Sequence, residues 1–169
     1  KLSIPTGGGK TYSGFRFALE EAIEKKKEHI IYIAPFLSIL EQNAADIKNV
    51  FADDFHILEH HSNMLFDNSD NGDYLQQHQL YEEDWSSPVI LTTMTRFLEV
   101  LFSDGSSNIR RMHQLKNSVI IVDEAQSIPV RCINLFTGMM NFMSYCCNDI
   151  VVLCTATQPL FDKVQHSII

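Results

Sequence analysis

The segment PTGGGKT, from Pro5 to Thr11, has the residue types and spacing needed to bind a polyphosphate. Its glycines lack a Cβ, so the backbone can curl and direct consecutive N–H groups toward phosphate oxygens. The lysine can neutralise the outer phosphates, and the threonine hydroxyl can ligate Mg²⁺ at the start of a helix, where the dipole favours anions. The segment therefore predicts a P-loop. The residues expected to bind the phosphates are Thr6, Gly7, Gly8, Gly9, Lys10 and Thr11.

The first segment matches the strict P-loop pattern only in part, because neither Ile4 nor Pro5 supplies its further glycine. A second segment, VIIVDEAQ from Val119 to Gln126, strengthens the prediction of a nucleotide site. Its four apolar residues are typical of a buried strand, and parallel sheets bind ligands where strands end. We expect Asp123 to hold Mg²⁺, partly through water, and Glu124 to deprotonate the attacking water. Alone, such an acidic pair would equally well begin a helix.

Helical and extended patterns alternate along the chain, which predicts an α/β fold with a mainly parallel sheet and helices on both faces. Strands are expected at 29–34, 55–59, 89–92, 118–122 and 150–154. Helices are expected at 11–27, 37–50, 74–83, 95–102, 109–115 and 130–145.

Length and composition predict one domain. The chain has 169 residues, of which 45% are hydrophobic, enough for a sizeable core. It has no apolar run of about 18 residues that could span a membrane and no secretory signal, so we expect no membrane contact and a cytoplasmic location. Because the chain begins at Lys1, with only a stub of the strand that should precede the P-loop, we expect a piece of a longer protein.

The net charge of -8 is unevenly distributed. Between Asn49 and Thr95 there are no Lys or Arg residues and nine acidic ones, whereas the rest of the chain carries 13 basic and 12 acidic residues. This distribution excludes a broad basic face for nucleic acid. Any nucleic-acid binding must use backbone amides, hydroxyls and a few placed cations.

The four cysteines, Cys132, Cys146, Cys147 and Cys154, form no C-x-x-C motif, so we expect reduced, buried thiols. His60 and His61 are adjacent but have no further ligands at suitable spacing, which disfavours a metal site there. The apolar helical segment from Leu135 to Tyr145 is expected to belong mainly to the core.

Three further polar segments follow predicted strands. They are IAPFLSILEQNA at 33–44, TTMTRF at 92–97 and TATQP at 155–159. Each alone is compatible with ordinary helix capping by its hydroxyl residues. Their shared position at the carboxyl ends of strands places them beside the P-loop and the acidic pair, which favours a common functional edge.

PTGGGKT, IAPFLSILEQ, TTMTRF, VIIVDEAQ and TATQP, in this order, resemble motifs I, Ia, Ib/Ic, II and III of the first RecA-like lobe of superfamily 2 helicases. FRFAL after the P-loop, EHHS at 59–62, DEAQSIP and TATQP further resemble the CRISPR-associated helicase-nuclease of type I interference systems. The resemblance covers nearly the whole chain. It implies one RecA-like P-loop NTPase domain over residues 1–169, with ATP and Mg²⁺ as cofactors.

The resemblance also implies roles for individual residues. The catalytic residues would be Lys10, Asp123, Glu124 and Gln126, with Thr11 and Asp123 serving Mg²⁺. Nucleic acid would meet Pro35, Ser38, Thr92, Thr93 and Arg96, and hydrolysis would be coupled to motion through Thr155, Ala156 and Thr157. Gln126 replaces the histidine that many relatives carry, and we expect it to sense the γ-phosphate because glutamine also donates and accepts hydrogen bonds.

The partners that the resemblance implies are single-stranded DNA, an RNA-guided CRISPR surveillance complex, and a second RecA-like lobe and a nuclease domain of the same parent chain. The second lobe would supply the arginine finger, so the fragment alone is expected to bind ATP weakly and to turn it over very slowly. No histidine here is followed by aspartate, so the nuclease motif of the resembling family is absent from this sequence.

Three alternatives stay open at this level. An RNA helicase, or the DNA motor of a restriction or repair enzyme, would share the same lobe and motifs. A non-catalytic RecA-like scaffold is a third possibility, although degenerate lobes usually lose the Lys, Thr, Asp and Glu residues that this chain keeps.

Overall fold

The computed structural model describes residues 9–49, 57–61 and 84–155. The helices and strands along the chain are α1 (Lys10–Lys25), β1 (His29–Ala34), α2 (Leu37–Lys48), β2 (Ile57–His60), β3 (Val89–Thr93), α4 (Met94–Phe102), α5 (Ser106–Gln114), β4 (Ser118–Val122), α6 (Ile133–Cys146) and β5 (Ile150–Leu153). Two 3-10 turns, Ala125–Ser127 and Val130–Cys132, lie between β4 and α6.

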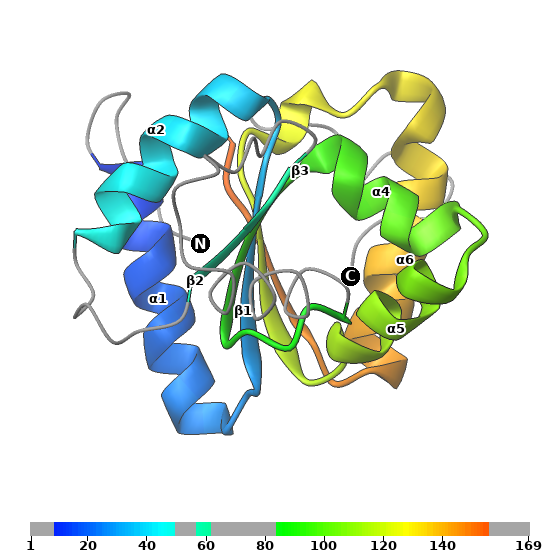
Figure 1. The fold of residues 1–169 in the computed structure, drawn as a ribbon, viewed down its shortest axis with the longest axis horizontal. Coiled ribbons are helices and arrows are strands. Elements are labelled where there is room, and N and C mark those ends of the chain that lie inside the picture. Colours follow the sequence, from blue (N-terminus) through cyan, green and yellow to red (C-terminus); the bar gives the residue numbers. More distant parts are fainter. Residues whose placement is uncertain (1–8, 50–56, 62–83, 156–169) are drawn as a thin grey trace, which may run out of the picture.

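The strands form one five-stranded sheet in the order β2-β3-β1-β4-β5, and all neighbouring strands are parallel. Helices α1 and α2 cover one face, whereas α4, α5 and α6 lie on the other (Figure 1). The prediction of a parallel α/β sheet with helices on both faces is therefore confirmed. β1 is central, with Ile31 paired to Ile90 of β3 and to Ile120 of β4.

Alternation along β1 divides the core into two layers, because successive side chains point to opposite faces of a sheet. Tyr32 packs with Phe15 of α1 and Leu40 of α2, whereas Ile31 packs with Phe97 of α4 and Phe136 of α6. Val119, Ile120 and Ile121 of β4, which pair with the centre of β1, are also fully or almost fully buried. The continuous apolar strands in the sequence thus reflect burial on both faces.

The predicted element boundaries differ from the structure in a few places. β1 and β4 are as expected, and most other described elements shift by one or two residues. α5 starts three residues early, directly after Gly105, and the expected helix at 130–145 is divided into a 3-10 turn and α6. The expected helix at 74–83 lies outside the described residues.

The prediction of buried cysteines is wrong, although all four thiols are free as expected. Cys146 is exposed because it lies beside the stripe through which α6 buries Phe136, Met140 and Met143. Leu135, on the outer side of α6, is 56% exposed, so only part of that apolar segment belongs to the core. None of the described helices is long and apolar enough to cross a membrane.

At the amino edge of the sheet, Asp149 is a buried carboxyl with an unusual environment. One oxygen accepts the Ser118 N–H at 2.8 Å, whereas the other, Oδ2, has no hydrogen-bond partner. Burial raises the pKa of Asp149 to about 7, despite the opposing effect of the Ser118 hydrogen bond. The native state therefore binds a proton more tightly than the unfolded chain, and stability is expected to fall as the pH rises from about 4 to about 7.

Asp149→Asn is expected to flatten this dependence, because the amide cannot ionise. We would compare urea unfolding midpoints at pH 5 and pH 8 by circular dichroism, with the exposed Asp104→Asn as the matched control. The wild type and the control should lose more stability between the two pH values than Asp149→Asn does. An equal loss in all three proteins would contradict the assignment of this pH dependence to Asp149.

Candidate functional site

The start of α1 lies at the carboxyl edge of the sheet, at the top of Figure 1. Gly9 precedes the helix with φ 73° and ψ 37°, a left-handed conformation that glycine adopts without strain. Its carbonyl accepts the Ser13 N–H at 3.0 Å, which begins the helix, and no side chain caps the first turn. Lys10 and Thr11, both partly exposed, are therefore in the turn where backbone N–H groups favour an anion. Thr6, Gly7 and Gly8 lie outside the described residues.

Asp123 extends β4 by one residue at the same edge. Its N–H donates to the Ile33 carbonyl at 2.9 Å, which continues the ladder between β1 and β4. Asp123 is two residues after Ile121, whose side chain packs in the layer beneath α1 and α2. Because side chains alternate along a strand, Asp123 belongs to that same face, where α1 begins. Its carboxyl is mostly buried, since only 7% of the residue is exposed.

Glu124 ends the strand by adopting a left-handed conformation, with φ 46° and ψ 47°. This conformation is uncommon for a residue with a side chain and is found disproportionately at functional sites. The Glu124 N–H donates to Asp123 Oδ1 at 2.9 Å, and the side-chain amide of Gln126 donates to the Glu124 carboxylate. The structure therefore joins three of the four predicted catalytic residues, Asp123, Glu124 and Gln126, by hydrogen bonds at the end of β4.

The packing around Cys154, directly after β5, brings α1 and the acidic pair into one neighbourhood. Burial is the main cause that raises the pKa of Cys154 to about 11, and the charges of Asp123 and Glu124 raise it further while that of Lys10 lowers it. The Ala125 N–H also donates to the Cys154 carbonyl at 3.0 Å. A Cβ at Gly14 would lie 3.2 Å from Cys154 Sγ, so this glycine allows α1 to pack closely against the end of β5.

The Asp123 carboxylate suits a magnesium ion. Oδ1 accepts the Glu124 N–H, and Oδ2 accepts the Tyr32 hydroxyl at 2.5 Å. Because a carboxylate offers about four lone-pair positions, each oxygen keeps capacity for a cation or its water. In the described ranges, no three His, Cys, Asp or Glu residues are grouped so as to hold a metal. Mg²⁺ at this edge would thus rely on Asp123, Thr11, water and phosphate oxygens, as is usual for this ion.

Tyr32 was not expected to contribute to the site from the sequence. It is only 1% exposed, and burial together with the Asp123 charge raises the pKa of its hydroxyl well above the usual range. The hydroxyl also accepts a hydrogen bond from Asn43 Nδ2 at 2.6 Å. A tyrosine in the middle of a largely apolar strand was the available signal, because a buried phenol needs a polar partner.

The predicted nucleic-acid contacts divide into exposed and buried residues. Ser38, in the first turn of α2, is exposed, and Thr93 and Arg96 are partly exposed. Pro35 is buried, and Thr92 is completely buried with its hydroxyl donating to the His60 carbonyl at 2.9 Å. Thr93 also caps α4, because its side chain accepts the Arg96 N–H. Only Ser38, Thr93 and Arg96 are therefore placed to meet a ligand directly.

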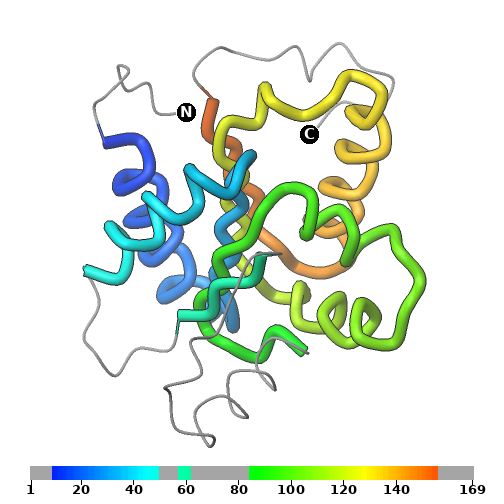
Figure 2. Tube along the Cα trace, turned by 45° about the horizontal axis from the view of Figure 1, so that its top comes forward, coloured from blue at the N-terminus to red at the C-terminus, as the bar shows by residue number. Residues whose placement is uncertain are grey.

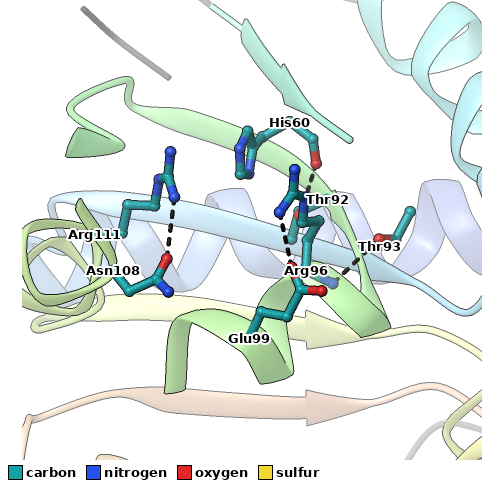
Figure 3. Close-up of polar contacts among 7 residues, drawn as sticks. All are labelled: His60, Thr92, Thr93, Arg96, Glu99, Asn108 and Arg111. Atoms are coloured by element: carbon teal, nitrogen blue, oxygen red, sulfur yellow. Dashed lines mark hydrogen bonds and ion pairs between the residues drawn. The ribbon is translucent and has the colours of Figure 1, made fainter. Parts of the chain in front are cut away.

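Arg96 belongs to a small basic cluster with Arg111 and His60 (Figure 3). Arg96 Nη1 pairs with Glu99 Oε2 at 2.8 Å, and Arg111 Nη1 donates to Asn108 Oδ1 at 3.1 Å. Burial lowers the pKa of His60 to about 3, and the nearby charges of Arg111 and Arg96 lower it further. His60 is therefore neutral near pH 7, and the two guanidinium groups supply the positive charge. The sequence did not single out Arg111, because it lies outside the motifs.

Thr155 follows Cys154 at the carboxyl edge and is partly exposed. Ala156 and Thr157, the other two predicted coupling residues, lie outside the described residues. Figure 2 turns the carboxyl edge toward the viewer and shows the start of α1, the start of α2 and the ends of β4 and β5 around it. The residues that the sequence placed at strand ends thus share one edge of the sheet.

A parallel sheet with a glycine-started helix and an acidic pair at the same edge defines a RecA-like P-loop domain, as the sequence predicted. The chain belongs to the DEAD/DEAH box helicase family, whose profile matches residues 2–165. It is therefore a member of an ATP-dependent helicase family, in which such domains bind ATP with Mg²⁺.

The chain is also similar to the CRISPR-associated nuclease/helicase Cas3 of Haloferax volcanii. The two are 24% identical over 177 residues, a match that covers 94% of this chain and 19% of that protein. The chain thus spans about a fifth of the length of this curated relative. The resemblance to the helicase lobe seen in the sequence is confirmed.

Proposed function

We propose that this chain is the ATP-binding lobe of a helicase or translocase that moves on single-stranded DNA in CRISPR interference. The observation that carries the proposal is the meeting of Lys10 and Thr11, at the start of α1, with Asp123 and Glu124, at the end of β4. Gly14 of α1 packs against Cys154 at the end of β5, and the Ala125 N–H, directly after the acidic pair, donates to the Cys154 carbonyl at 3.0 Å. Lys10 and the backbone N–H groups at the start of α1 suit the negative charge of a triphosphate, and the carboxylates of Asp123 and Glu124 suit the magnesium ion bound to it.

Each residue has a distinct part in hydrolysis under this proposal. Lys10 neutralises the outer phosphates, and Thr11 and Asp123 hold the ion, which supplies charge stabilisation at the phosphoryl group. Glu124 orients the attacking water and accepts its proton. Gln126 senses the γ-phosphate under this proposal, and its hydrogen bond to Glu124 supports this role. The arginine finger comes from a second RecA-like lobe of the parent chain, so residues 1–169 are one domain of a larger motor.

Single-stranded DNA is the proposed track because the exposed contacts suit a backbone rather than base edges. Ser38 offers an exposed side chain with a hydroxyl at the start of α2, and Arg96 offers a partly exposed guanidinium that is paired with Glu99. Phosphate contacts of this kind fix position without reading sequence, as a motor requires. The CRISPR role rests on the similarity to Cas3, and an RNA-guided surveillance complex is the proposed recruiting partner.

The experiment that tests this function is ATP hydrolysis by the full-length protein with single-stranded DNA, duplex DNA or RNA. Strong stimulation by single-stranded DNA would support the proposal. Stimulation by RNA alone would instead identify an RNA helicase, and the lack of both hydrolysis and Mg²⁺-dependent nucleotide binding would favour a scaffold. Recruitment is tested separately, by capture of the protein on target DNA with and without the surveillance complex.

Arg96→Ala is expected to weaken single-stranded DNA binding and to reduce its dependence on salt. Each phosphate contact contributes about 0.7 to the slope of log affinity against log salt for single strands, and one contact would be lost. We would measure fluorescence anisotropy of a labelled oligonucleotide over a range of salt concentrations. As the control, Lys25→Ala also removes one positive charge, in the last turn of α1 and away from the carboxyl edge of the sheet. It should leave the slope unchanged. Equal slopes in Arg96→Ala and the wild type would exclude this contact.

A further inference from the structure

A chain of two hydrogen bonds inside the protein ends on the carboxylate of Asp123. Asn43 Nδ2, on α2, donates to the Tyr32 hydroxyl at 2.6 Å, and that hydroxyl donates to Asp123 Oδ2 at 2.5 Å. The three residues come from α2, β1 and the end of β4. The bonds join parts of the chain that are 11 and 91 residues apart in sequence.

The sheet register explains why Tyr32 can reach Asp123. Tyr32 pairs with Ile121 across β1 and β4, and both side chains lie in the layer beneath α1 and α2. Asp123 is two residues further along β4 and so returns to the same face. A tyrosine hydroxyl extends beyond the other side chains of its strand, which brings it from the core to the carboxyl edge.

The direction of the hydrogen bonds is fixed by chemistry. An amide nitrogen of Asn43 can only donate, so the Tyr32 oxygen accepts from it and directs its own proton to Asp123. The other Asp123 oxygen, Oδ1, accepts the Glu124 backbone N–H at 2.9 Å. Each oxygen of the carboxylate thus has one protein donor, and rotation of the group would break both bonds.

We propose that Tyr32, supported by Asn43, is a positioning residue that sets the orientation of the Asp123 carboxylate for the magnesium–nucleotide complex. This inference rests on the function proposed above, because it assigns Asp123 to the ion. Tyr32 is 1% exposed and its hydroxyl donates to Asp123, so under this proposal it acts through Asp123. Outer hydrogen bonds of this kind typically contribute about 10-fold to 100-fold in metal affinity or activity.

Tyr32→Phe in the full-length protein tests the proposal, since it removes only the hydroxyl. We would measure equilibrium binding of a fluorescent ATP analogue, first with EDTA and then over a range of Mg²⁺ concentrations. The expected result is an unchanged affinity with EDTA and a Mg²⁺ requirement raised by about 10-fold. Asn43→Ala, which leaves the tyrosine in place, should shift the Mg²⁺ requirement in the same direction by less.

Thr137→Val is the matched control, because Thr137 is also fully buried and its hydroxyl donates within α6 to the Ile133 carbonyl at 3.0 Å. It should leave both affinities unchanged. If the wild type needs Mg²⁺ for tight binding and neither Tyr32→Phe nor Asn43→Ala changes that need, the positioning role is overturned while the proposed function stands. If the wild type shows no Mg²⁺-dependent binding, the proposed function is excluded, and this inference is excluded because it depends on that function.

Discussion

Replacing Lys10 by alanine is expected to abolish ATP hydrolysis by the full-length protein while leaving the fold intact. The ammonium group is the only cation in the first turn of α1, beside the proposed phosphate position. Loss of one preorganised charge that stabilises a transition state typically lowers the rate by about 10²-fold to 10³-fold. The lysine is partly exposed and makes no hydrogen bond or ion pair within the described part of the chain, so its removal should not disturb the core.

The measurement is steady-state ATP hydrolysis with single-stranded DNA, accompanied by thermal unfolding to confirm the fold. Lys25→Ala, in the last turn of the same helix, removes an equal charge far from the carboxyl edge and should keep wild-type activity. DNA-stimulated hydrolysis that survives in Lys10→Ala would exclude the start of α1 as the nucleotide site.

Glu124→Gln is expected to trap ATP without hydrolysis. The substitution keeps the size of the side chain and its ability to accept the Gln126 hydrogen bond, but it removes the basic oxygen that takes the proton of the attacking water. General-base catalysis contributes about 10²-fold to 10⁴-fold, so kcat should fall by that factor while ATP affinity is kept or increased.

A single-turnover assay that separates nucleotide binding from the chemical step checks this expectation. Glu41→Gln, an exposed residue on the outer side of α2, provides the isosteric control and should behave as the wild type. Normal turnover in Glu124→Gln would show that another group accepts the proton, and Asp123 would then be the next residue to test.

The strands and the acidic edge could be predicted from the sequence because both leave local patterns. Largely apolar runs predicted β1 and β4 with their observed bounds, since a strand that is buried on two faces consists mainly of apolar residues. The glycine run and the acidic pair predicted the two halves of a nucleotide site, of which Gly9, Lys10, Thr11, Asp123 and Glu124 lie among the described residues. Their meeting followed from one general rule, that parallel strands end at the same edge.

The remaining features depend on register and orientation, which local patterns do not encode. β1 and β4 are neighbours, and their register pairs Tyr32 with Ile121, which places Tyr32 in the same layer as Asp123 and allows their hydrogen bond. Likewise, TTMTRF gave no sign that Thr92 points inward to the His60 carbonyl while Thr93 caps α4. One residue of difference along a strand changes a surface hydroxyl into a core hydroxyl.

The environments of the cysteines give this protein a ready position for a spectroscopic probe. Thiol reagents react with the thiolate, and the raised pKa of Cys154, about 11, leaves very little thiolate at neutral pH in that side chain beside the proposed nucleotide site. Burial likewise raises the pKa of Cys147. Cys146, by contrast, is exposed at the end of α6, at the edge of the sheet opposite the start of α1. A fluorophore attached there would report on movement of this domain without occupying the carboxyl edge, where we propose that ATP is hydrolysed.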